Sequence, residues 1–350
     1  MAMSMNRLWG AGLLLSSLAG LMLAGCPEAA NDGGAEDREP IDAGAENRDP
    51  IEQGQSNARG DGAVAIPIAA TGSLQNPAFS PKGDLLLLTR FVDGYNNGPA
   101  DLLVVDVNGG APRTLVSDGS TNVNLPGSSW NAATGQITFS SARDPHDEIY
   151  IISAQGRSGE ERPVTSRTKY MSYEPALSPD GARVVFESHP LDVEGQGRIL
   201  VHRLDGAEAY REITPAGQDC RQPNWSPSGD QILYQRLNAG QWDLWITDST
   251  GANHRQLTTG KGDKTDASFS PDGKWIVYSS NEHGGDSANL YIIAVAGGPS
   301  TRATFFDGYD GAPSWSPDGE RIAFESYAGD PDGTRGTTLW WIKTPLTAKP

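Results

Sequence analysis

Five histidines are the side chains in this sequence best suited to metal chemistry, and three of them lie in polar segments rich in glycine or aspartate. These three are His146, His189 and His283. Imidazole nitrogens bind zinc, but a site requires several ligands about 2 Å from one ion. The spacing of the three matches no zinc pattern, and His202 and His254 have no neighbouring ligands in the sequence. We therefore expect solvated loop histidines and no metal centre.

Other patterns that could support chemistry are equally isolated. Ser166-x-x-Lys169 matches the S-x-x-K acyl-transfer motif only in its letters, because that motif acts on a helix beside further motifs. The chain contains neither G-x-S-x-G nor a P-loop. The acidic loop 329–334 has the oxygen-rich composition of calcium ligands but not the EF-hand spacing. The sequence therefore predicts no enzyme and no cofactor, and it leaves calcium open.

The N-terminus has the features of a bacterial lipoprotein. Arg7 precedes an apolar stretch, residues 8–23, that ends in Leu-Ala-Gly-Cys at Cys26. This resembles a lipobox, in which a peptidase cuts before the cysteine and acyl chains are then attached to it. We expect a signal peptide over residues 1–25 and lipidation at Cys26; an ordinary secretory signal or a membrane anchor is the alternative. Cys220 would then be a free, packed thiol.

Residues 26–62 are predicted to form a disordered acidic tether. They contain ten acidic residues against three arginines and almost no large apolar side chains, so they cannot bury enough surface to offset chain entropy. The whole chain has a formal net charge of −17. This charge argues against nucleic acid and anionic lipid headgroups as partners, because both require a basic surface.

Residues 63–350 repeat one phrase, and this repeat must provide any scaffold that positions functional residues. Six copies of a strand–turn–strand unit are centred on glycines spaced 44 to 52 residues apart: Gly83, Gly135, Gly181, Gly229, Gly273 and Gly319. The fullest copies read SPDG, in which Pro presets φ and Gly accepts a positive φ. A large side chain precedes each turn, and period-two alternation follows it, as expected for a half-buried strand.

Each unit continues with a third and a fourth strand, such as DLWITDS and RQLT. Four strands per unit of about 45 residues are typical of a propeller blade. The sequence therefore predicts an all-β fold, a six-bladed β-propeller of four-stranded antiparallel blades over residues 63–350. The last unit lacks a fourth strand, whereas AVAIPIAA (63–70) has no unit of its own. We expect this N-terminal strand to complete the last blade and close the ring.

The repeated WSPDG phrase, followed by I-x-F or I-x-Y, resembles the PD40 (WD40-like) repeats of the TolB-like β-propeller family. The resemblance implies a non-enzymatic protein-binding module, and in this family the propeller binds the lipoprotein Pal of the Tol–Pal envelope system. The lipid anchor and the acidic tether depart from the family pattern, which includes an N-terminal α/β domain. Oligogalacturonate lyases share similar repeats and hold a metal with histidines, so a carbohydrate-active or metal-binding propeller is one alternative. Membership of a Tol–Pal-like system is another.

The candidate binding surface follows from the blade topology. The SPDG turns lie on one face, whereas the loops between second and third strands lie on the other, together with the connections between blades. These connections lead into the innermost strands, so we expect their side chains to line the mouth of the central channel. The candidate residues are Tyr170, Tyr173, Glu174, Asp219, Arg221, Gln222, Asp266, Tyr309 and Asp310. Tyrosine and arginine among carboxylates are typical of protein interfaces.

The leader and the resemblance together indicate the location and the partner. We expect a cell-envelope lipoprotein at the outer membrane that faces the periplasm, with exposure at the cell surface as the alternative, because no Asp follows Cys26. The expected partner is an envelope protein, for example a Pal-like lipoprotein. The sequence leaves the identity of this partner and the oligomeric state open.

Overall fold

The computed structural model of the chain describes residues 58–346, apart from 118, 120–122, 125–129, 145, 194, 207–208, 285–286 and 328–335. The expected signal peptide, the expected lipidation site Cys26 and tether residues 26–57 lie outside the described residues, as does the whole acidic loop 329–334. All regular elements in the described part are β-strands. The membrane-span search of these residues found no helix with the length and apolarity that a bilayer crossing requires.

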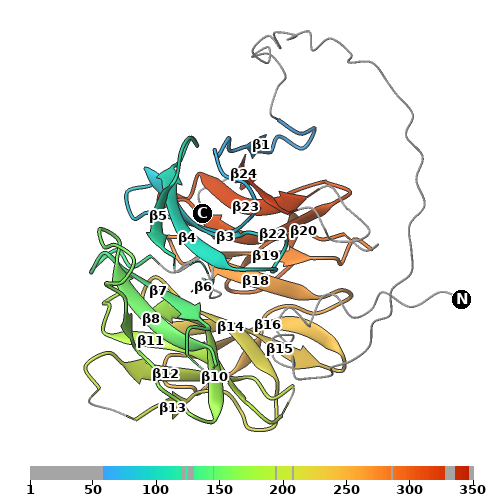
Figure 1. Cartoon of the computed structure of the whole chain (residues 1–350). Coiled ribbons are helices and arrows are strands. Elements are labelled where there is room, and N and C mark those ends of the chain that lie inside the picture. The colour runs from blue at the N-terminus through green and yellow to red at the C-terminus, as the bar shows by residue number, and fades with distance from the viewer. Residues whose placement is uncertain are drawn as a thin grey trace, which may run out of the picture. The chain divides into compact units, whose positions relative to one another are not determined.

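Twenty-four strands form six antiparallel four-stranded sheets, which are the six predicted blades (Figure 1). Blade 1 comprises β2 (Ser73–Phe79), β3 (Leu85–Phe91), β4 (Ala100–Asp106) and β5 (Arg113–Val116). Blade 2 comprises β6 (Val123–Asn124), β7 (Gln136–Ser141), β8 (Glu148–Ser153) and β9 (Arg162–Pro163). Blade 3 comprises β10 (Tyr170–Leu177), β11 (Arg183–Pro190), β12 (Arg198–Arg203) and β13 (Arg211–Glu212). Blade 4 comprises β14 (Cys220–Trp225), β15 (Gln231–Asn238), β16 (Gln241–Asp248) and β17 (Arg255–Gln256). Blade 5 comprises β18 (Lys264–Phe269), β19 (Trp275–Ser280), β20 (Asn289–Ala294) and β21 (Thr301–Arg302). Blade 6 comprises β22 (Tyr309–Trp315), β23 (Arg321–Tyr327) and β24 (Thr338–Lys343), together with β1 (Val64–Ala65).

The ring is closed by the N-terminal strand, as the sequence predicted. β1 pairs antiparallel with β24, so that Val64 lies opposite Trp341 and Ala65 opposite Trp340. In Figure 1 the blue β1 lies beside the red β24. The N–H of Ile66 donates to the carbonyl of Leu339 (2.9 Å) and extends this pairing by one bond. The last blade therefore contains both early and late parts of the chain.

The hydrophobic core consists of six clusters, and each lies between two neighbouring blades. The cluster at the closure joins Ala323 and Leu339 of blade 6 to Leu86 and Leu88 of blade 1. All four side chains are fully buried. Burying one leucine stabilises a fold by roughly 1.5–3 kcal/mol. Because each cluster needs both of its blades, a single blade has little stability alone.

The SPDG turns stack on one another around one face, which we call the turn face. All six turn glycines have positive φ, between 65° and 76°. An added Cβ on Gly229 would lie 3.4 Å from Cδ of Pro179, and one on Gly83 the same distance from Cδ of Pro317. Both of these glycines therefore meet the proline of an adjacent blade. The repeated phrase thus builds contacts between blades on this face.

Candidate functional site

The innermost strand of five blades is interrupted at the same position by a β-bulge. The residue at the bulge has left-handed backbone in each case: Asn76 (φ 50°), Glu174 (48°), Gln222 (50°), Asp266 (52°) and Ala312 (45°). A non-glycine residue costs roughly 1–2 kcal/mol in this conformation, so the surrounding ring must maintain it. We call these five residues the channel ring. The corresponding part of blade 2, within 125–129, lies outside the described residues.

The channel ring lines a cavity on the propeller axis. All five members contribute to its wall, together with neighbouring residues such as Ser268 and Pro313. The volume of the cavity is about 30 Å³, enough for only one or a few water molecules.

Hydrogen bonds between blades hold the ring residues in place. The N–H of Gln222 donates to Oε2 of Glu187 in blade 3 (2.7 Å), and the N–H of Asn76 donates to Oε2 of Glu325 in blade 6 (2.9 Å). The N–H of Asp266 donates to Oε1 of Gln222, whose Nε2 donates back to Oδ1 of Asp266, both at 2.8 Å. Each blade thus supports the bulge of the next, which pre-organises the channel ring.

Carboxyl groups concentrate at this position. Burial raises the pKa of Glu174 well above its usual value, and three neighbouring carboxylates add to the rise. Burial also raises the pKa of Asp266, and it raises that of Glu325 to about 7. In the part of the chain that the structure describes, none of these three groups forms an ion pair with a basic side chain. The site is therefore rich in carboxyl groups, and burial holds the pKa of each of the three above its usual value.

Three tyrosines border the site on the side of blades 1 and 6. The hydroxyls of Tyr95 and Tyr309 each donate to Oε1 of Glu325 at 3.2 Å. The ring of Tyr95 lies 6.1 Å from those of Tyr309 and Tyr327. Tyr95 comes from the loop between β3 and β4, where Gly94, Asn96 and Gly98 all have positive φ. The sequence analysis missed Tyr95, whose only signal was an aromatic residue in an irregular loop.

A second polar network lies on the side of blades 2 to 4. Asp219 forms an ion pair with Arg221 (3.0 Å), whose guanidinium lies 5.1 Å from the Trp242 ring. Burial raises the pKa of Asp147 to about 6, although a hydrogen bond from the Tyr173 hydroxyl opposes the rise. Arg221, the most exposed of these charged groups, is thus held by both a carboxylate and an aromatic ring.

The structure brings most of the nine predicted residues to one end of the channel. Glu174, Gln222 and Asp266 belong to the channel ring. Tyr309 borders it through Glu325. Four further members of the set occupy the second network and its edge: Tyr170, Tyr173, Asp219 and Arg221. Tyr170 lies under the guanidinium of Arg167, 4.1 Å from its ring centre.

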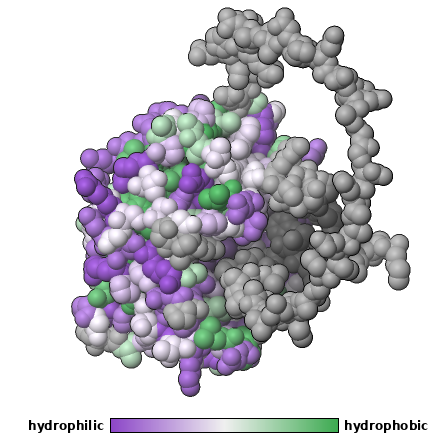
Figure 2. Space-filling view, in the orientation of Figure 1, coloured by the Kyte–Doolittle hydropathy of each residue, from purple (hydrophilic) through white to green (hydrophobic). Residues whose placement is uncertain are grey.

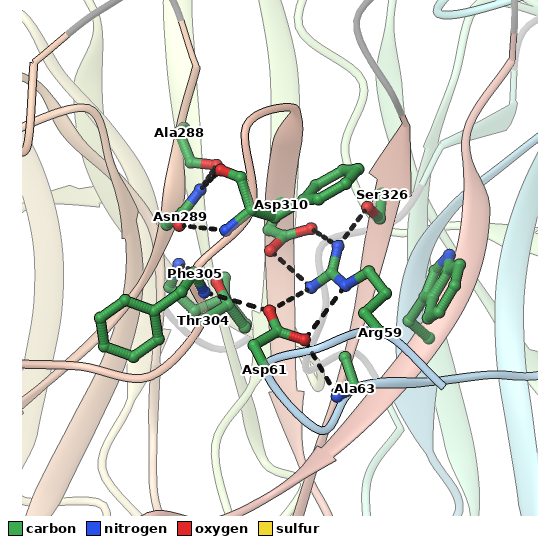
Figure 3. Close-up of polar contacts among 12 residues, drawn as sticks. Arg59, Asp61, Ala63, Ala288, Asn289, Thr304, Phe305, Asp310 and Ser326 are labelled. Atoms are coloured by element: carbon green, nitrogen blue, oxygen red, sulfur yellow. Dashed lines mark hydrogen bonds and ion pairs between the residues drawn. The ribbon is translucent and has the colours of Figure 1, made fainter. Parts of the chain in front are cut away.

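Asp310 differs from the sequence-based expectation, because it is fully buried and its carboxylate is taken up by Arg59. Its carboxylate accepts two hydrogen bonds from the guanidinium of Arg59, at 2.8 and 2.9 Å (Figure 3). Arg59 also pairs with Asp61 at 3.0 Å. We call Arg59, Asp61 and Asp310 the N-terminal clasp.

Aromatic rings and backbone groups complete the clasp. The Arg59 guanidinium lies 4.2 Å from the ring centre of Phe306 and 5.1 Å from that of Trp340. The Asp61 carboxylate accepts hydrogen bonds from the N–H groups of Ala63 and Phe305. The sequence analysis assigned residues 58–62 to the tether, whereas the structure shows that Arg59 and Asp61 belong to the propeller. Their partners lie far away in sequence, so local composition could not reveal them.

The histidines occupy separate places. His189 contacts Glu187 (3.1 Å), and His283 contacts Ser287 (3.2 Å). His146 contacts the carbonyl of Arg167 (2.8 Å). Among the described residues, no group of three or more His, Cys, Asp or Glu side chains has the geometry to hold a metal ion.

Comparison with known proteins shows which family this architecture matches. Residues 159–333 match the family described as the TolB β-propeller domain (PD40). An uncharacterized protein of Agrobacterium fabrum, Atu1656, is 25% identical over 182 residues, which cover 52% of this chain and 60% of that protein. The Tol-Pal system protein TolB of Francisella tularensis subsp. mediasiatica is 37% identical over 108 residues, which cover 31% of this chain and 23% of that protein. The matches thus span less than two thirds of these relatives.

The fold has a solved counterpart as well. The structure of a putative TolB from Agrobacterium tumefaciens superimposes with a TM-score of 0.59 at 18% identity. The match covers 79% of this chain and 92% of that one. At this level of identity the comparison supports the fold alone.

Proposed function

The chain belongs to the TolB β-propeller (PD40) family, and from this membership we propose that it is a non-enzymatic binding module of the bacterial cell envelope whose ligand is another protein. The observation that carries the proposal is the contrast between the two faces of the ring. The turn face consists of stacked turns. The opposite face, which we call the mouth face, carries the loops between second and third strands and the connections between blades, with the channel ring at its centre. Irregular loops on a rigid scaffold are where binding residues concentrate.

The distribution of apolar side chains supports the same face. In the described ranges, the exposed large hydrophobic residues are Val92, Leu191, Val193, Leu237 and Phe305. Four lie in loops or connections of the mouth face, and Leu237 lies at the end of β15, beside the hairpin to β16 on the same face. The view in Figure 2 shows a mostly hydrophilic surface on which apolar residues are scattered. The five exposed side chains are thus at the end of the ring that carries the irregular loops, where a partner would meet them.

We further propose that the module is anchored in the outer membrane through acylated Cys26 and faces the periplasm. The lipobox-like residues before Cys26 support this proposal. A Pal-like lipoprotein in a Tol–Pal-like system is the proposed partner, since one relative carries the name Tol-Pal system protein TolB. Replacing Cys26 with Ala should release the protein into the soluble fraction, and its persistence in the membrane fraction would contradict the anchor.

The function can be tested by capturing proteins from an envelope extract with the full chain. We expect a specific envelope protein to be retained by the wild type and lost by a double variant of the mouth face, Leu237→Asp with Phe305→Asp. The matched control changes the turn face, Lys82→Asp with Lys274→Asp, and should retain the partner. Equal capture by both variants would contradict the assignment of the binding face. Copurification of one equivalent of a transition metal would contradict a non-enzymatic scaffold.

A further inference from the structure

Three arginines line one concavity at the turn-face end of blade 3. The concavity has a volume of about 630 Å³, and its wall includes Arg183, Arg203 and Arg211 together with Val201 and Asp180. Arg183 begins β11, Arg203 ends β12 and Arg211 begins β13, three strands that are neighbours in one sheet (Figure 1). We call Arg183, Arg203 and Arg211 the arginine trio.

The strand register puts the three arginine side chains on one face of the sheet. Arg183 lies directly opposite Arg203 in the β11–β12 pair, and Arg211 lies opposite Val201 in the β12–β13 pair. Because Val201 and Arg203 are two positions apart on one strand, they point to the same face. Arg211 is therefore a diagonal neighbour of Arg203, at a typical separation of about 7–8 Å. Like charges directly opposite one another destabilise an antiparallel pair, and a bound anion would offset this cost.

The repeat does not require this arrangement of charges. At the position of Arg203, the third strands of blades 1 and 4 carry the aspartates Asp106 and Asp248. The residues opposite these aspartates, Leu85 and Gln231, are uncharged. Blades 2 and 5 have uncharged residues at both positions. Blade 3 thus carries a positive charge where two other blades carry a negative one, and the propeller fold does not account for this reversal.

Two members of the trio are held in place without an ion pair. The guanidinium of Arg211 donates to the carbonyls of Ser249 and Thr250 in blade 4, at 3.0 and 2.6 Å. The guanidinium of Arg183 lies 4.9 Å from the ring centre of Trp225. Within the described ranges, neither arginine pairs with a carboxylate. Because arginine stays protonated in proteins, both positive charges are present at any physiological pH.

Two carboxylates of blade 3 lie beside the trio. Asp180 belongs to the wall of the concavity, and its Oδ1 accepts hydrogen bonds from the Ser178 hydroxyl and from the N–H of Ala182. Asp205 pairs with Arg203 at 2.6 Å, and these two side chains are 53% and 39% exposed. An ion pair this exposed contributes at most about 1 kcal/mol, so an anionic ligand can replace Asp205. Three guanidinium groups thus face two carboxylates, one of which is displaceable.

We propose that the arginine trio binds the phosphate group of a soluble phosphate monoester. One guanidinium can satisfy both oxygens of a carboxylate with two parallel hydrogen bonds. A phosphate monoester instead presents three acceptor oxygens and a charge of about −1.5 to −2 at neutral pH, so it uses donors from several guanidinium groups. A phospholipid headgroup has the same chemistry, but a chain of net charge −17 is repelled by an anionic membrane. The site lies on the opposite end of the ring from the mouth face, so the inference goes beyond the proposed protein-binding function.

The test titrates glycerol 3-phosphate into the full chain by isothermal titration calorimetry, with Cys26→Ala present so that no acyl anchor interferes. We expect saturable binding that is tighter than the binding of succinate, a dicarboxylate. Arg183→Gln and Arg203→Gln should each raise the Kd for glycerol 3-phosphate at least about tenfold. Arg211 is left unchanged, because it also holds the turn of blade 4. Absence of saturable binding, or equally tight binding of succinate, would overturn the inference.

Blade 6 provides the matched control. Arg321 lies opposite Lys343 and 5.6 Å from the ring centre of Trp341, but β1 places Val64 where blade 3 has its third arginine. Arg321→Gln should therefore keep the Kd within about twofold of the wild type. Thermal unfolding verifies that each variant is folded.

Two further outcomes would contradict the inference. An equal rise of the Kd in Arg321→Gln and in Arg183→Gln would overturn the assignment of the site to the trio. Binding to vesicles that contain phosphatidic acid, without binding of glycerol 3-phosphate, would overturn the soluble ligand. Both outcomes leave the proposed function intact, because that function depends on the mouth face.

Discussion

Arg59 and Asp310, which lie 251 positions apart in the chain, form a doubly hydrogen-bonded ion pair from which water is almost excluded. The side chain of Asp310 is fully buried, and that of Arg59 is 11% exposed. Burial alone would lower the pKa of Arg59, but its bonds to Asp310 and Asp61 raise it above its usual value. The pair ties the segment before β1 to the first strand of blade 6, so it secures the same closure as the β1–β24 pairing.

Arg59→Ala should destabilise the protein by about 3–5 kcal/mol, because it leaves Asp310 buried without a counter-charge. The free energy of unfolding of Arg59→Lys should lie between those of the wild type and Arg59→Ala, since an ammonium group cannot reproduce the planar pair or the stacking on Phe306. Urea unfolding monitored by tryptophan fluorescence gives the free energies of unfolding.

The control for the clasp is Arg198→Ala, which removes an ion pair whose two side chains are each 34% exposed. This change should cost at most about 1 kcal/mol. If Arg59→Ala and Arg198→Ala have equal effects, the clasp does not hold the closure.

Glu325 should make stability fall as pH rises. Its pKa is about 7 in the folded protein, against the usual 4.5, so the folded state keeps a proton that the unfolded state releases between these values. The contribution of Glu325 is therefore most favourable below about pH 4.5 and is lost as pH rises to about 7. Glu325→Gln should remove this loss, and its stability relative to wild type should increase by about 1–3 kcal/mol across that window.

The measurement is a series of denaturant curves for both proteins from pH 4 to pH 8. The groups that interact with Glu325 are Tyr95, Tyr309, Tyr327, Asp266, Glu174 and the N–H of Asn76, and all are present in the variant. The difference between the two curves therefore reports the titration of Glu325 together with its coupling to Glu174 and Asp266. A difference that is independent of pH would show that this carboxyl is not held protonated.

Ala312→Gly should stabilise the protein by roughly 0.5–1 kcal/mol. Ala312 has φ 45° and no polar side chain, so the change relieves backbone strain without removing a hydrogen bond. Ala323→Gly is the control, because Ala323 is buried in the middle of β23 and lacks a positive φ. There glycine should destabilise by about 1 kcal/mol. Thermal unfolding of both variants measures the two effects, and loss of stability at Ala312 would contradict strain in the channel ring.

Cys220 should resist thiol reagents in the native protein. It is fully buried, and burial raises the pKa of its thiol to about 12, so almost no thiolate forms at neutral pH. In a Cys26→Ala chain, Ellman's reagent should detect no thiol before denaturation and one thiol in guanidinium chloride. Rapid native labelling would mean that the interface between blades 3 and 4 opens readily.

Most of the architecture was predictable from the sequence because the same strand–turn–strand unit occurs six times. The positive φ of the turn glycines and the closure by residues 63–70 both follow from comparing copies of one phrase. The blade boundaries follow from period-two alternation, which is a local property of each strand.

The site was predictable only in part, because its key features arise between blades. The residue before proline ordinarily prefers extended backbone, so the left-handed Glu174 and Gln222 contradict local propensity. Neighbouring blades impose this conformation, for instance through the hydrogen bond that the N–H of Gln222 donates to the carboxylate of Glu187. The alignment of the repeat copies contained a usable signal for the left-handed position, since Asn76 occupies in its copy the place that Glu174 and Gln222 occupy in theirs. The sequence around Arg59 gave no signal of the clasp, because its partner Asp310 is distant in sequence.

The pairing of Val64 with Trp341 also dictates the order in which the molecule can be made. A chain that emerges with its N-terminus first holds its first strand from the beginning but cannot complete the last sheet until β24 is available. Until then Leu86 and Leu88 of blade 1 lack the partners that cover them in the finished ring. Pairings of such long sequence separation form slowly, and the open ring meanwhile exposes strand edges and apolar surface. Chaperone protection is therefore most needed in the compartment where the chain folds, until the final blade is complete.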